Sequence, residues 1–478
     1  MPSKKLITLL QTFSTLELNR FRKYLASPYF NEHDIFLKLF DEVEKYIRHS
    51  LPNHDVPSPK QIIWQQIFNN TPYNDAQMRR LLSELTQLAL SFRAQEQHQQ
   101  NPVAAQLSLL KILDKPALEL HFHSVLRQLE AVQEKNGWRD ATYHFQQFQI
   151  EHQHYRFIEK HNRNPEMLQH LAAADFHLDC YYISQKLRHY ADALGYRNFI
   201  TIEHSIYLPD NFLSFVQSSP FIKEPAVAAY FLVVQMFLHT AQEDYYFELK
   251  SLLQEKMTDF QLIELKELYT HLINYCIDIK INNGIISYFK ELFEILKIAL
   301  AYHILLDNNI LPTPFYKLIV YVGIQLKEFA WTEHFIQSYS ARLPVEEREN
   351  ALTYNLARLY FEQQQYDKVI EQLREVEYDN LTYALGGKLM LLKTYYELNE
   401  YLALDSLIDS FRVYLRRNQT ISKEVRQQYL NVLRFIKKLS NIRPGDQTAI
   451  MKIEQQIAAC KNLADKGWIV SKVEGLKG

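Results

Sequence analysis

The scarcity of glycine is the feature that most constrains how this chain can fold. The sequence has 10 glycines among 478 residues, about 2% of the chain where roughly 7% is average. Glycine supplies the positive φ angles of tight turns and lets a backbone approach a ligand closely, so this chain has few places for either. Compact β-rich folds and glycine-rich nucleotide-binding loops are therefore disfavoured.

The charge and the apolar residues are balanced as in a folded globular protein. The chain has 53 Lys+Arg against 55 Asp+Glu, and 47% of its residues are hydrophobic. A net charge of -2 gives no overall attraction to nucleic acid or to a membrane surface, so any such attraction must be local. No stretch approaches the roughly 18 uninterrupted apolar residues that a bilayer span needs, and we expect no membrane partner.

The cysteines and the N-terminus favour a cytoplasmic location. Cys180, Cys276 and Cys460 lie far apart with no CxxC spacing, which is typical of reduced, buried thiols. Lys4 and Lys5 are followed by only five mostly apolar residues, too few for a secretory leader.

Local patterns predict helices throughout, with an N-terminal helical domain over residues 1–100. Ser14 and Glu17 have the spacing of a capping box, which predicts a helix that ends near Ala26, before Ser27-Pro28. Further helices are expected over 31–50, from Pro59 to Phe68, and from Asn74 or Asp75 onward. This domain resembles the opening of uncharacterised bacterial helical proteins, to which no function attaches.

Long antiparallel helices are expected over residues 101–224. The pattern favours helical stretches at 103–112, 115–162 and 165–195, before a segment rich in proline marks a change of architecture.

Paired helices then recur every 35 to 45 residues from position 225. The stretch LARLYFEQQQYDKVIEQL (356–373) aligns without a gap with LLKTYYELNEYLALDSLI (391–408), and a weaker copy lies 37 residues upstream of the first. The sequence here resembles the tetratricopeptide repeat, a helix-turn-helix unit of about 34 residues. Val369, Leu392 and Leu404 stand where the family has small residues, and Arg416 stands where a proline normally ends the unit. We therefore expect an all-α protein with an irregular tetratricopeptide-like α-solenoid over 225–442 and a C-terminal capping helix and tail over 443–478, in which Trp468 and Val470 cover the last repeat.

The resemblance also implies a peptide-binding groove. In the family, the first helix of each unit lines the groove with residues one turn apart. The matching positions here are Lys317, Tyr321, Ile324, Tyr354, Arg358, Phe361, Leu389, Lys393 and Tyr396. Aromatic rings supply rigid contact area and cations anchor charge, so this set suits an extended peptide with acidic groups or a free carboxylate. The alternative is that the aromatic residues pack against the neighbouring repeat.

The strongest charge run of the chain follows the repeats. Between residues 412 and 443, nine cations stand against the single acid Glu424, with Tyr414, Tyr429 and Phe435 among them. The basic-face candidates are Arg412, Arg416, Arg417, Lys423, Arg426, Arg434, Lys437 and Lys438. Three interpretations stay open: a solvated or internally neutralised surface, a site for an acidic protein, and a nucleic-acid site.

No pattern indicates catalysis. The sequence has no GxSxG, no phosphate-binding GK[ST] loop and no GxGxxG. Nine of the 18 histidines lie between 121 and 189, but their spacing forms no recognisable ligand set, so solvated or core-edge histidines are favoured over a metal or proton site. The glycine pair Gly386-Gly387 indicates close helix packing or a turn.

A helix-turn-helix outline around Arg79 and Arg80 is weak. Residues 1–100 carry 12 basic and 10 acidic side chains, whereas most DNA-reading domains are more basic. A packing or docking domain is therefore favoured.

Taken together, these patterns predict a non-catalytic cytoplasmic scaffold, without a cofactor or metal, that binds a protein or peptide. Nucleic-acid binding through the basic 412–443 face is the second hypothesis.

Overall fold

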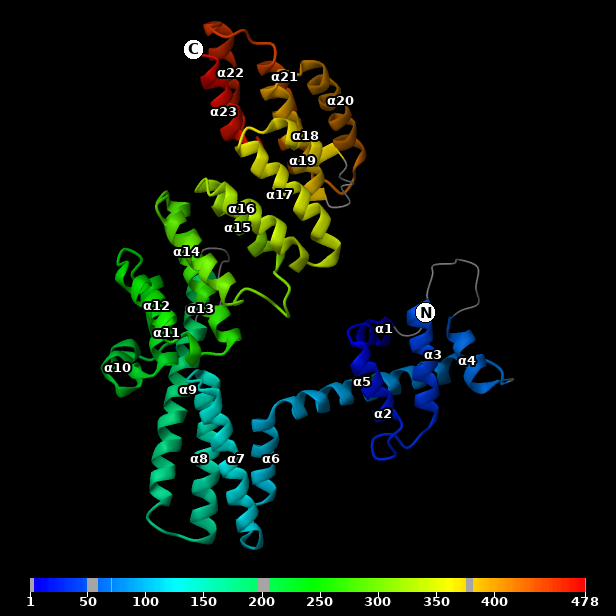
Figure 1. Cartoon of the computed structure of the whole chain (residues 1–478), viewed down its shortest axis with the longest axis vertical. Helices are drawn as coiled ribbons and strands as arrows, with labels where there is room; N and C mark the ends of the chain where they lie inside the picture. The colour runs from blue at the N-terminus through cyan, green and yellow to red at the C-terminus, as the bar shows by residue number, and fades with distance from the viewer. Residues whose placement is uncertain (1–3, 50–58, 70, 197–205, 375–380, 478) are drawn as a thin grey trace. The chain divides into compact units, whose positions relative to one another are not determined.

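The chain is helical throughout its described length. The computed structural model describes residues 4–49, 59–69, 71–196, 206–374 and 381–477. Within these ranges the chain forms 23 α-helices, short 3₁₀ and π-helical segments, and no β-strand (Figure 1). The prediction of an all-α protein is confirmed. None of the helices in these ranges combines the length and the apolar character that crossing a membrane would need.

The chain divides into two compact units, Met1–Tyr182 and Ile183–Gly478. The division falls within the long helix α9, Met167–Tyr196. The boundaries expected near residues 100, 224 and 442 stay predictions.

The N-terminal part of the first unit has its own core. Its helices are α1 (Lys4–Gln11), α2 (Thr15–Leu25), α3 (Ile35–His49), α4 (Pro59–Phe68) and α5 (Asp75–Gln100). Phe21, Phe40 and Trp64 are fully buried among them. The predicted capping box is confirmed, because Ser14 N–H donates to Glu17 at 2.7 Å and Glu17 N–H donates to the Ser14 hydroxyl at 3.2 Å. The expected loop after α3 falls largely on residues 50–58, outside the described ranges.

Three further helices follow in the first unit: α6 (Pro102–Ile112), α7 (Glu119–Asn136) and α8 (Ala141–His161). The single helical stretch expected over 115–162 is wrong. Gly137 ends α7 with a φ of 70°, and the Asp140 side chain starts α8 by accepting from Tyr143 N–H at 2.8 Å. A left-handed glycine and a capping aspartate three residues apart are ordinary helix boundaries that periodicity alone overlooks.

The second unit continues as successive helices. They are α10 (Phe212–Ser218), α11 (Pro225–Leu238), α12 (Asp244–Glu255), α13 (Leu262–Asn274), α14 (Tyr288–Ala301), α15 (Thr313–Gln325), α16 (Phe329–Tyr339), α17 (Arg348–Glu362), α18 (Tyr366–Arg374), α19 (Leu381–Glu397), α20 (Tyr401–Arg417), α21 (Lys423–Leu439), α22 (Gln447–Ala459) and α23 (Lys466–Gly475). From α15 to α20 each helix packs on the next, and α15 and α19 also contact α17.

The turns inside three of these helix pairs have the same geometry. Lys327, Gln364 and Asn399 adopt φ angles of 57°, 60° and 58°. In each turn the next residue donates its N–H to the carbonyl five positions earlier, at 2.9 Å: Glu328 to Gly323, Gln365 to Tyr360, and Glu400 to Tyr395. This is the 6→1 hydrogen bond of a Schellman motif. The pairs α15–α16, α17–α18 and α19–α20 therefore recur at the spacing of 37 and 35 residues that the sequence indicated.

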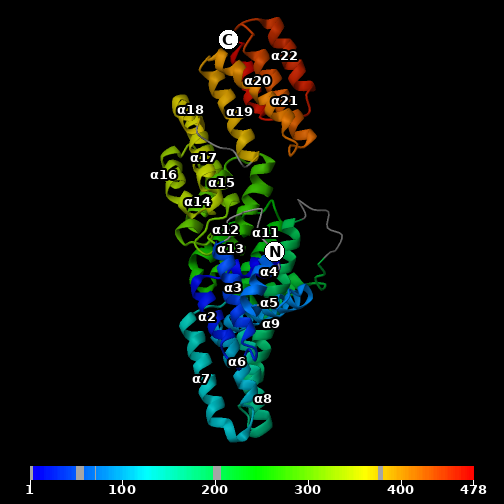
Figure 2. The same ribbon diagram turned by 90° about the vertical axis from the view of Figure 1, so that its right-hand side faces the viewer.

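The C-terminal helices complete one apolar cluster. Helices α20, α21 and α22 lie side by side (Figure 2), and Ile469 and Val473 of α23 are buried in the cluster that they form. Trp468 and Val470, the residues expected to cover the last repeat, are partly buried against the same cluster. A covering role, which stays a prediction, would have a direct physical basis, because an end repeat otherwise exposes its apolar face.

A π-helical segment, Tyr275–Lys280, joins the end of α13 to the turn before α14 and was not predicted. Lys280 is almost fully buried there, with its ammonium 2.6 Å from Glu243 and over the rings of Tyr275 and Tyr288. Such segments often occur at functional sites. Here the buried charge is already paired within the chain, which gives it a structural role.

The contact between α15 and α16 leads to a stability prediction. A methyl group at Gly323 would lie 2.2 Å from Oγ1 of Thr332, so we expect Gly323→Ala to lower the free energy of unfolding by about 1–3 kcal/mol. Gly467→Ala is the matched control, because a Cβ there meets no atom within 4 Å. Thr332→Ala should restore part of the loss in the double variant. Urea unfolding followed by circular dichroism measures these differences, and equal stability of Gly323→Ala and Gly467→Ala would contradict the contact.

Candidate functional site

A cleft of about 370 Å³ lies in the second unit where α17, α19 and α21 meet the start of α23. Its lining consists of Tyr354, Arg358, Phe361, Glu362, Gly386, Leu389, Met390, Lys393, Tyr429 and Asp465. Five of the nine groove candidates are therefore brought together: Tyr354, Arg358, Phe361, Leu389 and Lys393. The volume is within the range of pockets that hold small ligands or single peptide side chains.

Cations and rings alternate along the first helices of the three pairs. The Arg358 guanidinium lies 5.4 Å from the Tyr321 ring, and the Lys393 ammonium lies 4.6 Å from the Phe361 ring. Lys317 lies 4.8 Å from the ring of Tyr383. Each such contact stabilises by about 0.5–1 kcal/mol at exposed sites. The rings thus pack between neighbouring helices and also fix the positions of the cations. Packing of the aromatic residues and a role in the groove, the two interpretations that the sequence left open, are therefore compatible.

Lys393 is engaged by the chain's own C-terminal segment. Its ammonium lies 2.7 Å from the Asp465 carboxylate, and its side chain is 14% exposed. Asp465 precedes α23 with a φ of 48°, and its side chain makes no capping bond to that helix. An aspartate in this position normally caps the helix. Its carboxylate instead neutralises the cation that the sequence analysis offered to a ligand.

Tyr396 also faces α23 and is partly buried. The Trp468 ring packs edge-on against Tyr396, with centroids 5.4 Å apart. The Trp468 indole N–H donates to Glu397 at 3.0 Å, and Lys472 pairs with the same carboxylate at 2.6 Å. Burial raises the pKa of Tyr396 to about 12. Helix α23 therefore packs on the C-terminal end of α19, whereas Gly386, Leu389 and Met390 of α19 line the open cleft.

Arg358 is the cleft-lining cation whose charge is not neutralised within the described part of the chain. The Arg358 side chain is half-buried, and its guanidinium lies against the ring of Tyr321. No described carboxylate lies within ion-pair distance of its guanidinium. A guanidinium held over a ring in this way presents a fork of donors to a carboxylate.

Tyr354 has mainly a packing role. Burial raises the pKa of its hydroxyl, and its ring lies edge-on to Tyr383 with centroids 5.3 Å apart. A Cβ at Gly386 would lie 2.7 Å from the Tyr354 hydroxyl oxygen. Gly386 is thus at a close helix contact, one of the two roles expected for it.

The basic-face candidates do not act as one surface. Arg412 pairs with Asp409 at 3.1 Å, and Lys437 pairs with Asp405 at 2.5 Å. Arg426 donates to the backbone carbonyl oxygens of Asn418 and Ile421 at 3.0 and 3.2 Å, and so holds the turn between α20 and α21. The acidic residues expected to neutralise the run lie partly in 375–380, outside the described ranges. Arg416, Arg417 and Lys423 are exposed.

Arg434 and Lys438 line a second cleft, of about 650 Å³, between α21 and the end of α22. The other lining residues are Gln427, Asn431, Gln456, Ala459, Cys460, Lys461 and Asn462. Three cations and four amides form this cleft without an acidic residue in its lining. Of the interleaved aromatics, Phe435 is buried and Tyr429 lines the other cleft.

The histidines of the first unit form pairs rather than a ligand cluster. His144 of α8 and His177 of α9 lie with their Nδ1 atoms 2.9 Å apart. His161 lies 2.8 Å from Asp114, and His170 lies 2.7 Å from Glu151. Among the residues placed by the structure, no three His, Cys, Asp or Glu side chains are grouped so that they could hold a metal ion.

The remaining sequence candidates have local roles. Arg79 and Arg80 pair with Asp75 and Glu84 on their own helix, α5. Cys180 and Cys276 are buried as expected, whereas Cys460 is half-buried, so the expectation of three buried thiols is wrong for Cys460.

Comparisons with known protein families, with curated proteins and with solved structures find no match. The resemblance to the tetratricopeptide repeat rests on the internal repeats of the chain alone.

Sequence reasoning missed Asp465 and Lys461, and it placed Tyr429 with the basic run rather than in the cleft with Arg358. Asp465 lies 72 residues from Lys393, so no local spacing relates the two. The sequence shows a lysine on one helix and an aspartate just before another, but only the fold places the two side chains in contact.

The pair formed by the buried His144 and the half-buried His177 predicts an acid-sensitive first unit. Burial lowers the pKa of His144 to about 3 and that of His177 to about 4. Above about pH 6.5 both are neutral whether folded or unfolded. Below that pH the two histidines bind protons in the unfolded chain but stay neutral in the folded chain. The free energy of unfolding therefore falls between about pH 6.5 and 4, by up to about 1.4 kcal/mol per pH unit for each histidine.

Urea unfolding at several pH values measures this dependence. We expect His144→Gln/His177→Gln to flatten the loss of stability, and His121→Gln, at an exposed position, to leave it unchanged. An undiminished loss in the double variant would contradict the assignment.

Proposed function

We propose that this protein is a non-catalytic scaffold that binds a peptide segment of a partner protein along α15 and α17. The observation that carries the proposal is the half-buried Arg358, held 5.4 Å from the Tyr321 ring at the edge of a 370 Å³ cleft. Tyr354 and Phe361 give the cleft apolar walls. A carboxylate of the peptide binds Arg358, and an apolar side chain enters the cleft.

This proposal implies that the partner's peptide segment is short. Asp465 and helix α23 already engage Lys393 and Tyr396, so the groove positions left for a peptide are those of α15 and α17 together with Leu389 in the cleft. Preorganisation favours binding, because the cation and the rings need no rearrangement.

The test is capture of a partner from a native lysate by the tagged chain, read by mass spectrometry with and without nuclease. We expect Arg358→Glu to lose the captured protein while the melting temperature changes little, because the side chain is only half-buried. Arg416→Glu is the charge-matched control at an exposed position and should capture normally. Capture that survives Arg358→Glu, or a large fall in melting temperature with it, contradicts the proposed role of Arg358.

A second candidate function is nucleic-acid binding through the cleft between α21 and α22. Arg434, Lys438 and Lys461 line it without an acidic neighbour, which favours a phosphate backbone. The lining holds no aromatic side chain on which a base can stack, so duplex binding by phosphate contacts suits it better than binding of single strands.

The nucleic-acid function predicts a steep salt dependence. If three cations contact phosphates, raising the salt concentration from 50 to 200 mM should lower the affinity for duplex DNA roughly 40-fold. Arg434→Glu/Lys438→Glu/Lys461→Glu should abolish binding of a labelled duplex, measured by fluorescence anisotropy. Arg412→Glu/Arg416→Glu/Lys423→Glu removes the same charge elsewhere and should weaken binding far less. A flat salt profile, or equal losses in the two triple variants, excludes this site.

A further inference from the structure

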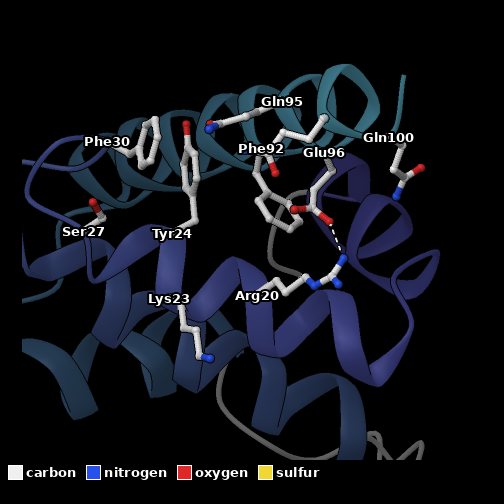
Figure 3. A pocket seen from close by; sticks show the side chains of 10 residues that line it. Arg20, Lys23, Tyr24, Ser27, Phe30, Phe92, Gln95, Glu96 and Gln100 are labelled. Atoms are coloured by element: carbon white, nitrogen blue, oxygen red, sulfur yellow. Dashed lines mark hydrogen bonds and ion pairs between the residues drawn. The ribbon is translucent and has the colours of Figure 1, made fainter. Parts of the chain in front are cut away.

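A cleft of about 540 Å³ in the N-terminal part of the first unit has a different chemistry from the groove. It lies between the end of α2, the loop that follows α2, and the end of α5 (Figure 3). All of its lining residues belong to the N-terminal helical domain, for which the sequence predicted only packing or docking.

Aromatic rings form one wall of this cleft. The Tyr24 and Phe30 rings stack with centroids 4.5 Å apart and planes at 13°, and Phe92 lies edge-on to Tyr24 at 5.6 Å. Tyr29, next to Phe30, is 87% exposed and extends the aromatic surface. Figure 3 shows the Tyr24 ring between the Phe30 ring and Gln95. Burial raises the pKa of Tyr24, so its hydroxyl stays protonated and can donate a hydrogen bond.

Side-chain amides line the cleft beside these rings. Gln95, Gln99 and Gln100 line the cleft from α5, and none of them hydrogen-bonds to another described residue. Each amide offers two donors and an acceptor. Gln95 and Gln99 are one helical turn apart and so lie on one face of α5.

The cleft carries little net charge. Arg20 and Glu96 pair at 2.9 Å across its rim and neutralise each other. Lys23 is exposed and has no carboxylate partner among the described residues. One free cation is too few for a nucleic-acid backbone but is enough to favour a single acidic residue.

Unused amides beside rings match an extended peptide. A helical peptide satisfies its own backbone hydrogen bonds, whereas a polyproline II segment has none and exposes its carbonyl oxygens. Proline rings pack on aromatic side chains, and their fixed φ lowers the entropy lost on binding. We propose that this cleft binds an extended, proline-containing segment of a partner protein, with an acidic residue of that segment beside Lys23.

The experiment uses the full-length chain and a phage-displayed library of random dodecapeptides. Peptides that bind the wild type are counter-selected against Gln95→Ala/Gln99→Ala, and the best survivor is synthesised with a fluorophore for anisotropy titration. We expect the surviving peptides to be enriched in proline. The synthetic peptide should bind at least ten-fold more weakly to the glutamine double variant, and replacing its prolines with alanine should weaken binding similarly.

Two controls separate this cleft from the other sites. Gln97→Ala/His98→Ala changes exposed residues of the same helix that do not line the cleft, and should bind normally. Arg358→Glu should also bind normally, so failure of the proposed groove and failure of this cleft are distinguishable. The proposal is overturned if no peptide depends on Gln95 and Gln99. It is equally overturned if the dependent peptides are no richer in proline than the library, or if a helical peptide or a single-stranded oligonucleotide displaces them.

Discussion

The left-handed turn inside each helix pair is the constraint from which the arrangement of the repeats follows. Lys327, Gln364 and Asn399 all hold a positive φ, a conformation that costs an L-residue roughly 1 kcal/mol or more. The 6→1 hydrogen bond that closes each turn offsets this cost and fixes the angle at which the second helix leaves the first. Because the three turns are alike, α15, α17 and α19 occupy equivalent places. The cations and rings that the sequence aligned therefore meet across neighbouring helices.

Glycine scarcity was a sound guide to fold class and a poor guide to turns. The absence of strands from the described residues agrees with it. In the same residues, however, nine non-glycine positions have a positive φ, and five of them are asparagines. Asparagine tolerates this region because its short side chain hydrogen-bonds locally. The expectation of few tight turns was therefore too strict, since asparagine takes much of the role that glycine has elsewhere.

How far the sequence predicted the site depended on the distance between interacting residues. The capping box spans three residues and the repeat spans 35, and both leave a regular pattern in the sequence. The ion pair between Lys393 and Asp465 leaves none, because a single contact over 72 residues has no period. The same limit applies to Arg426, which looks like one more surface cation in the sequence. Its backbone contacts become visible only when the turn between α20 and α21 is formed.

Pairing within the chain decides which cations remain for a partner. Lys393 and Lys437 each lie against a carboxylate, so a ligand that used either would first have to break an existing ion pair. Arg358 and Arg434 have no such partner in the described residues and need only exchange water. The three clefts consequently differ in kind. One combines Arg358, Glu362 and the Lys393–Asp465 ion pair with apolar walls, one presents several cations with amides, and one presents amides with stacked rings. A ligand matched to one of these surfaces would lose hydrogen bonds or charge partners at the others, because specificity is a difference between affinities.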